Sequence, residues 1–372
     1  MITQNEKIYQ LALKLSPGIG DVLIRNLVSY CGSASEVFKA NWKKLERIPG
    51  IGEVNGKPIL NKTALADAEK EFERSQKLGI EILFYTDKNF PERLKRLYDA
   101  PALLYYQGNA DLNTARTVSL VGTRQATEYG KHVTESIVEA LKSHNALILS
   151  GLAYGIDIAA HRAAVKLGMP TVGVMGSALN VMYPAIHDKT AKAMIENGGL
   201  LTENPLDTKP DAPRFVTRNR IIAGMSDAVI VVESAKKGGG LITAEFANNY
   251  HREVFAVPGN LNAKYSEGCN DLIRKNKANI FTSVQELVEA LNWDLTASKS
   301  SNKQPELSVL DFSNFTDEEA QILSLLRQHT DMHVDELSWQ SQVPMSRLAS
   351  LLLSLEFQGI VNSLPGKRYV LA

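Results

Sequence analysis

Between residues 81 and 292 the sequence repeats one pattern: a short apolar run, a turn that usually contains glycine, and a helical segment. Such alternation is typical of right-handed crossovers and of a parallel sheet with helices on both faces. We therefore expect an α/β fold with an extended Rossmann-like, doubly wound sheet, whose ligand should lie beyond the carboxyl ends of the strands. The apolar runs are 81–85, 118–121, 146–149, 171–175, 200–202, 228–232 and 254–257.

Residues 1–80 have the pattern of short helices and contain the sequence Pro-Gly-Ile-Gly twice, at 17–20 and 49–52. Each copy follows an apolar helical stretch, and glycine allows a tight turn and a close approach of another backbone. The segment resembles tandem helix-hairpin-helix (SAM-like) modules, in which turn amides can hold a phosphate at a helix N-terminus. Alternatively, the turns only pack a small helical domain.

The central domain is expected to span 81–294, and the polar segment 295–313 after it predicts a linker. Residues 314–372 predict three helices and a terminal hairpin, which together make a winged helix. Its presumed recognition helix, MSRLASLLLSLEFQ, carries one basic residue and is strongly apolar, so we expect it to contact protein rather than a DNA groove. The wing carries Lys367 and Arg368, so a regulator that binds duplex DNA is an alternative interpretation.

The charge balance argues against a large, uniformly positive surface, because the sequence has 41 basic and 41 acidic residues. A nucleic-acid binder of this composition needs a local basic site. Cys31 and Cys269 lie far apart in sequence, which argues against a disulfide framework and fits a reducing cytosol. We expect a cytoplasmic protein without a signal sequence, a transmembrane helix or a structural zinc site.

Four segments expected at the carboxyl edge of the sheet carry the candidate binding residues. A small turn after the 118–121 strand delivers Arg124, whose planar guanidinium suits phosphate oxygens. The second segment joins a strand to a helix, and the backbone of Ser150, Gly151 and Gly155 is placed to hold an anion at that helix N-terminus. Two glycines are common in such turns, so this second segment is weak evidence alone.

The third segment, 214–220, is predicted to be a basic loop with three arginines in seven residues. No acid lies between Asp211 and Asp227, and Phe215 offers a stacking surface for a base, a combination typical of single-strand binding. Alternatively, one arginine supports the fold and the others are solvated. The fourth segment, 236–243, combines two lysines with three glycines that let the backbone approach phosphate closely.

The predicted ligands of a nucleic acid are Arg124, Ser150, Gly151, Gly155, Phe215, Arg218, Asn219, Arg220, Lys236, Lys237, Gly238, Gly239 and Gly240. The motifs of several enzyme classes are missing. A Walker A sequence fails at Gly56-Lys57, which Pro58 follows in place of serine or threonine, and no G-x-G-x-x-G follows the 118–121 strand. We therefore predict no catalytic residue, no metal and no cofactor.

Six motifs together resemble the DprA (Smf) family. They are VGTR at 121–124, SGLAYGID at 150–157, RNRIIAGMS at 218–226, GGGLITA at 238–244, EVFAVPGN at 253–260 and EGCNDLI at 267–273. The resemblance implies a non-catalytic homodimer that binds and protects incoming single-stranded DNA and loads the RecA recombinase during natural transformation. It also implies Arg124, Arg218 and Arg220 as the main DNA ligands, with backbone contacts from Ser150, Gly151 and Gly155.

The sequence departs from the family pattern at two places. In the loop after the third strand of the parallel sheet, Asn180 and His187 replace the usual residues and Ala185 carries no charge. The glycine loop has Gly-Gly-Gly-Leu where Ser-Gly-Ser-Leu is usual, so a hydroxyl donor is lost. Both changes put contacts from these loops in doubt but should leave the fold intact.

An enzyme is the remaining alternative, because the domain also resembles LOG-type nucleotide phosphoribohydrolases with the motif G-G-x-G-T-x-x-E. Gly238, Gly239 and Glu245 match this motif, but Leu241 and Ile242 stand where glycine and threonine belong. Release of free base from a nucleotide would identify such an enzyme.

Overall fold

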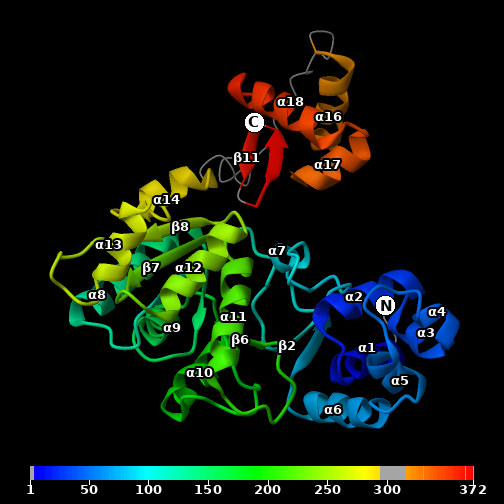
Figure 1. The fold of residues 1–372 in the computed structure, drawn as a ribbon. Coiled ribbons are helices and arrows are strands. Elements are labelled where there is room, and N and C mark those ends of the chain that lie inside the picture. The colour runs from blue at the N-terminus through cyan, green and yellow to red at the C-terminus, as the bar shows by residue number, and fades with distance from the viewer. Residues whose placement is uncertain (1–3, 294–314, 330, 365, 372) are drawn as a thin grey trace.

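The computed structural model describes residues 4–293, 315–329, 331–364 and 366–371. Figure 1 shows a small helical part at the N-terminus, a large α/β core and a C-terminal winged helix. The expected fold class is confirmed. The predicted linker, 295–313, lies outside the described residues.

The N-terminal part consists of α1 (Gln4–Leu15), α2 (Asp21–Cys31), α3 (Ala34–Lys39), α4 (Trp42–Leu45), α5 (Glu53–Leu60) and α6 (Leu65–Lys77). The two Pro-Gly-Ile-Gly sequences form the turns before α2 and α5, where Gly18 and Gly50 have φ of +74° and +87°. Such angles strain any residue with a Cβ, which explains the glycines. Buried side chains such as Leu11 join Phe84 and Tyr105 of the sheet in one core, so the helices are anchored on the α/β domain.

The core contains a nine-stranded sheet in the order β1-β2-β6-β5-β4-β3-β7-β8-β9. The strands are β1 (Glu81–Phe84), β2 (Leu103–Gly108), β3 (Thr117–Gly122), β4 (Leu147–Gly151), β5 (Thr171–Val174), β6 (Gly198–Thr202), β7 (Ala228–Glu233), β8 (Glu253–Ala256) and β9 (Asn279–Ile280). Strands β3 to β9 are parallel, whereas β2 pairs antiparallel with both β1 and β6. The strand order reverses between β3 and β7, which makes their carboxyl ends the topological switch point.

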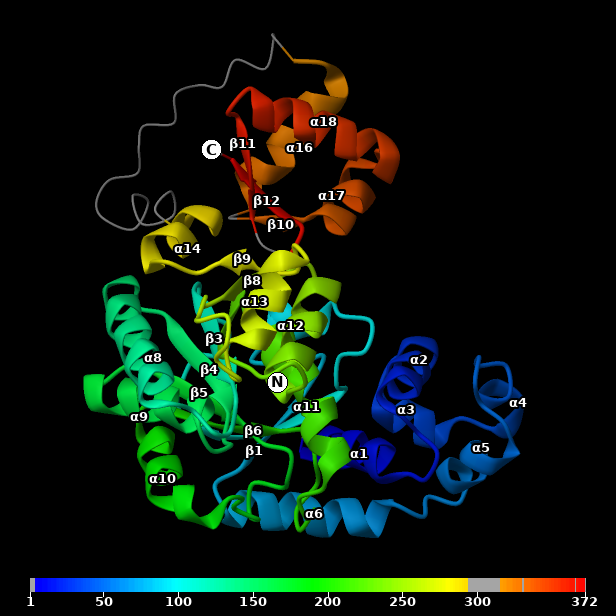
Figure 2. The same cartoon turned by 60° about the vertical axis from the view of Figure 1, so that its left-hand side comes forward.

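Helices cover both faces of this sheet (Figure 2). They are α7 (Glu92–Lys95), α8 (Glu128–Leu141), α9 (Ile156–Leu167), α10 (Asp188–Glu196), α11 (Ala212–Met225), α12 (Gly239–Asn249), α13 (Glu267–Arg274) and α14 (Val284–Ala290). Helices α11, α12 and α13 share one apolar cluster with the strands, and α8, α9 and α14 share another. The two clusters are the two layers expected of a doubly wound sheet.

Two strands of the core sheet were not predicted. The run at β2 lacks a following helix, because this strand leads directly to β3 and turns the sheet edge antiparallel. Strand β9 has two residues, and both are exposed, so it carries no apolar signal.

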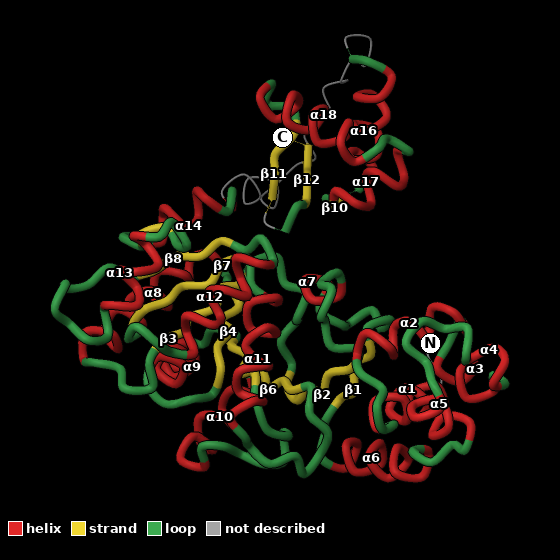
Figure 3. The backbone as a smooth tube through the Cα atoms, viewed as in Figure 1, coloured by secondary structure: helices red, strands yellow, loops and turns green. Residues whose placement is uncertain are grey.

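The predicted basic loop at 214–220 is wrong, because these residues belong to α11 (Figure 3). The helix begins where the Asp211 carboxylate accepts a hydrogen bond from the backbone N–H of Arg214 at 2.9 Å, with proline in the first turn. Both are typical helix start signals.

The winged helix consists of α16 (Asp317–Gln328), β10 (Met332–His333), α17 (Val334–Ser341), α18 (Met345–Phe357), β11 (Val361–Leu364) and β12 (Arg368–Leu371), with strand order β10-β12-β11. A capping box starts α16, in which Thr316 and Glu319 exchange side-chain to backbone hydrogen bonds at 3.3 and 2.9 Å. Within the described residues, no helix has the length and apolar character required to span a membrane.

Candidate functional site

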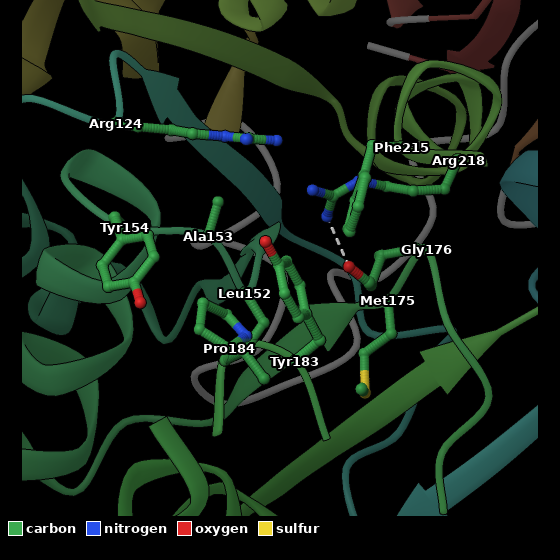
Figure 4. Close-up of a pocket in the computed structure, with 11 residues that line it drawn as sticks. Arg124, Leu152, Ala153, Tyr154, Met175, Gly176, Tyr183, Pro184, Phe215 and Arg218 are labelled. Carbon is green, nitrogen blue, oxygen red and sulfur yellow. Dashed lines mark hydrogen bonds between the residues drawn. The ribbon is translucent and has the colours of Figure 1, made fainter. Parts of the chain in front are cut away.

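A cavity lies at the carboxyl ends of β3, β4 and β5, beside the switch point of the sheet (Figure 4). Its lining combines two arginines and three aromatic rings with apolar side chains and backbone. The lining residues are Arg124, Leu152, Ala153, Tyr154, Val174, Met175, Gly176, Tyr183, Pro184, Phe215 and Arg218. The turn after β3 therefore meets three segments that are distant in sequence. They are the loops after β4 and β5 and the start of α11.

An arginine and two aromatic rings face one another across this cavity. The Arg124 guanidinium carbon lies 5.5 Å from the centroid of the Phe215 ring, and the Tyr183 ring lies 5.5 Å from the same ring on another side. Arg124 is exposed, and no acidic side chain in the described part of the chain pairs with it. This arrangement provides flat surfaces for a planar ligand and a cation for an anionic one.

Arg218 forms the base of the cavity and is buried, with 5% of its surface exposed. One terminal nitrogen donates to the backbone oxygen of Val174, and the other lies 4.0 Å from the Asp157 carboxylate. Among the described residues, the buried Arg218 Nε–H has no hydrogen-bond partner. Burial raises the pKa of the Asp157 carboxyl, and the Arg218 guanidinium opposes that rise. The guanidinium is therefore charged, desolvated and only partly satisfied.

Gly151 is required for this position of Arg218. A Cβ atom at residue 151 would lie 2.0 Å from Arg218 Nη1, closer than any real contact. The buried imidazole of His161 forms a hydrogen bond through Nε2 to the Gly151 carbonyl oxygen at 2.6 Å. Because a carbonyl oxygen can only accept, Nε2 carries the proton. Burial lowers the pKa of His161 to about 4, so this imidazole is neutral near pH 7.

The other residues of the loop after β4 support its shape. The Ser150 hydroxyl is buried and donates to the backbone oxygen of Leu120 at 2.6 Å, so the side chain is turned away from the cavity. Gly155 has a φ of +78° and packs so closely on the turn after β3 that a Cβ would lie 2.1 Å from the Thr123 oxygen. These two residues hold the loop against the turn that carries Arg124. Their predicted backbone contacts to a ligand stay predictions.

Arg220 is not brought to the cavity, contrary to its prediction as a main ligand. It is 8% exposed, its guanidinium donates to the Glu203 carboxylate, and the Asp21 carboxylate of α2 lies 3.7 Å away. Two residues along a helix turn by about 200°, so Arg218 and Arg220 occupy opposite faces of α11. Arg220 therefore connects the core to the N-terminal helices.

The fourth predicted segment lies at the same edge but beyond the cavity lining. Lys236, Lys237, Gly238 and Gly239 are exposed, whereas Gly240 is buried close to Gly122, at the end of β3. The amide of Asn219, which is 7% exposed, donates to the Gly239 oxygen at 3.3 Å. This contact ties α11 to the start of α12.

Sequence reasoning missed the aromatic residues Tyr154 and Tyr183 of the cavity. Each stands in a loop that follows a strand, which is the signal that would have found them. His187 was also missed as a neighbour of the site. It is 3% exposed, and its ring lies 5.1 Å from that of Tyr154. In the part of the chain that the structure describes, neither ring nitrogen has a hydrogen-bond partner. Burial lowers the pKa of His187.

The alternative enzyme site does not assemble around this cavity. Glu245 is exposed on α12 and is not among the lining residues. Within the described residues, no group of three or more His, Cys, Asp or Glu side chains is arranged to hold a metal ion.

Comparison with known families and proteins agrees with this architecture. Residues 81–292 match the family described as DNA recombination-mediator protein A, and residues 301–367 match the DprA winged helix domain. The chain is 28% identical to Protein Smf of Synechocystis over 396 residues, which cover 99% of each chain. It is 39% identical to the DNA processing protein DprA of Bacillus subtilis over 214 residues, 57% of this chain and 72% of that protein.

Two solved structures are similar over the core. The DNA processing protein A of Streptococcus pneumoniae aligns with 78% of this chain and 98% of its own at a TM-score of 0.66 and 33% identity. The Helicobacter pylori protein, described for its single-stranded DNA binding mode, aligns with 58% of this chain and 96% of its own at a TM-score of 0.53 and 31% identity. The matches include the sheet that carries the cavity and, in the Smf relative, almost the whole chain. The chain belongs to the DprA (Smf) family of DNA recombination-mediator proteins.

Proposed function

We propose that the protein binds single-stranded DNA, with one nucleotide held in the cavity between Arg124, Phe215 and Arg218. The carrying observation is Arg218, a buried guanidinium at the base of a cavity that is also lined by Arg124, an arginine with no acidic partner among the described residues. A phosphate in the cavity accepts hydrogen bonds from these two guanidinium groups, because anions accept strong hydrogen bonds from guanidinium donors.

The aromatic rings of the cavity are the second support for this proposal. Phe215 and Tyr183 offer faces on which a base stacks, and every base has such a face, so we expect weak sequence preference and strong salt dependence. A duplex keeps its bases stacked inside, so it cannot use these rings. The single-stranded DNA binding described for the Helicobacter pylori relative supports the same choice of ligand.

The test is fluorescence anisotropy of labelled oligo-dT and of a matched duplex, for the wild type, Phe215→Ala and Phe215→Tyr. We expect preference for the single strand and near-normal binding in Phe215→Tyr. Phe215→Ala should lose about 5- to 150-fold in affinity, since stacking contributes about 1–3 kcal/mol per base. Equal affinity for the duplex, or normal binding by Phe215→Ala, would refute the assignment.

We further propose that the protein acts without catalysis in the cytoplasm, as a homodimer that protects incoming strands and loads RecA during natural transformation. Family membership supports this role. Light scattering of the purified chain measures the dimer. RecA filament assembly on strands covered by a single-strand-binding protein measures loading, and no stimulation by the wild type would refute that part.

A further inference from the structure

The segment between β8 and α13, residues 257–266, lies against the switch point of the sheet. Its last turn is fixed by the backbone N–H of Ser234, which donates to the Tyr265 oxygen at 2.7 Å. Its first turn is closed by Asn270, whose amide group exchanges two hydrogen bonds with the Gly259 backbone at 2.9 and 3.2 Å. The segment is therefore a shaped part of the binding edge.

Tyr265 joins this segment to the turn that carries Arg124. Its hydroxyl donates to the side-chain oxygen of Gln125, while the Arg124 guanidinium lies over the Phe215 ring. Two consecutive residues of one turn therefore contact two separate aromatic side chains. The Tyr265 ring is partly exposed and lies outside the cavity lining.

A lysine lies beside this second ring, and two more follow the residue that anchors its backbone. Lys264 Nζ lies 5.3 Å from the centroid of the Tyr265 ring, and Lys236 and Lys237 follow Ser234 by two and three residues. In the part of the chain that the structure describes, none of these three lysines forms an ion pair. The segment 257–266 contains no acidic residue, and Glu267 follows it.

We propose that Tyr265 is a second base-stacking subsite. A strand that leaves the Phe215 cavity passes over Arg124 and Gln125, stacks a neighbouring base on Tyr265 and places its phosphates beside Lys236, Lys237 and Lys264. An aromatic platform flanked by cations is the arrangement that single-strand binders repeat along a strand. This inference rests on the proposed function and extends the ligand from one nucleotide to several.

The experiment uses the full chain and oligo-dT of increasing length, starting from a dinucleotide. Tyr265→Ala should bind the shortest oligomers like the wild type but lose about tenfold in affinity for longer ones. Tyr265→Phe, which loses only the bond to Gln125, should retain the length dependence. Tyr98→Ala removes a 72% exposed tyrosine elsewhere on the core and is the matched control.

A direct readout comes from Tyr265→Trp, with the emission of Trp42, Trp293 and Trp339 in the wild type subtracted. Stacking should quench the new tryptophan on saturation with long oligo-dT. The backbone bond from Ser234 to residue 265 does not involve the side chain, so the segment keeps its anchor in every variant.

Unchanged length dependence in Tyr265→Ala, or an unquenched Tyr265→Trp, would overturn the second subsite while the cavity assignment stands. A wild type that binds no oligo-dT of any length would instead refute the proposed function itself.

Discussion

Gly151→Ala should displace Arg218 from the cavity without removing it. The added Cβ would lie 2.0 Å from Arg218 Nη1 and 2.3 Å from Nη2, so the guanidinium must leave its hydrogen bond to Val174. The φ angle of Gly151 is not positive, so alanine fits the strand backbone. The substitution therefore acts on the position of one side chain.

The magnitude follows from the contact that is lost. A hydrogen bond to a charged group contributes about 1.5–3 kcal/mol, which corresponds to about 10- to 100-fold in affinity for single-stranded DNA. Arg218→Ala should lose a similar amount. The double variant should lose no more than either single one, because both changes remove the same interaction. The slope of log affinity against log salt should fall by about 0.7 in each case.

The assay is anisotropy of labelled oligo-dT across a salt series for the wild type, both single variants and the double variant. Arg218→Lys is included because it keeps a charge beside the buried Asp157. Arg274→Ala is the charge control: Arg274 is paired with Asp271 and lies at the end of α13, at the opposite edge of the sheet. Urea unfolding checks that each variant is folded. Normal binding by Gly151→Ala, or additive losses in the double variant, would refute the reasoning.

Three further outcomes are expected. Arg220→Ala should lower the free energy of unfolding by about 3 kcal/mol, because it removes the ion-pair partner of the largely buried Glu203, whose side chain is 11% exposed. The affinity of the folded protein for oligo-dT should stay unchanged, and a loss of affinity in a stable variant would return Arg220 to the binding site. The pKa of His161 is about 4 when folded and 6.5 ordinarily, so between these values the unfolded chain binds more protons and stability falls as the pH falls. The loss reaches at most about 3 kcal/mol near pH 4, and urea unfolding of His161→Asn at several pH values should show a flatter dependence. Gly155→Ala should destabilise the fold by about 2 kcal/mol or more in thermal unfolding, since positive φ and the contact with Thr123 both oppose a Cβ; wild-type stability would contradict this.

The sequence predicted the parallel sheet because buried parallel strands are continuous apolar runs between turns. Strand β7, AVIVVE, is buried at every position and illustrates this signal. The same rule predicted the edge at which the cavity lies, since only loops after the carboxyl ends of strands meet at a switch point. It missed β2, because an antiparallel edge strand needs no crossover helix, and β9, because two exposed residues have no apolar pattern.

The residues that line the cavity were predicted less well, because charge along a sequence does not give direction in space. The run 214–220 was interpreted as a loop that presents all its arginines to one ligand. The N-cap Asp211 and the proline after it were available as helix signals. With α11 recognised, the turn of about 100° per residue would have separated Arg218 from Arg220.

These two buried arginines also show how the partners of a charge distinguish a structural residue from a ligand-binding one. Desolvation of a guanidinium is costly, and the protein must offset it with nearby carboxylates and acceptors. Arg220 has Glu203 in contact and Asp21 at 3.7 Å, so its charge is satisfied within the fold. Arg218 has one carbonyl, a carboxylate at 4.0 Å and an Nε–H without a partner. The incomplete set lies at the cavity, which is why Arg218 and not Arg220 is expected to bind phosphate.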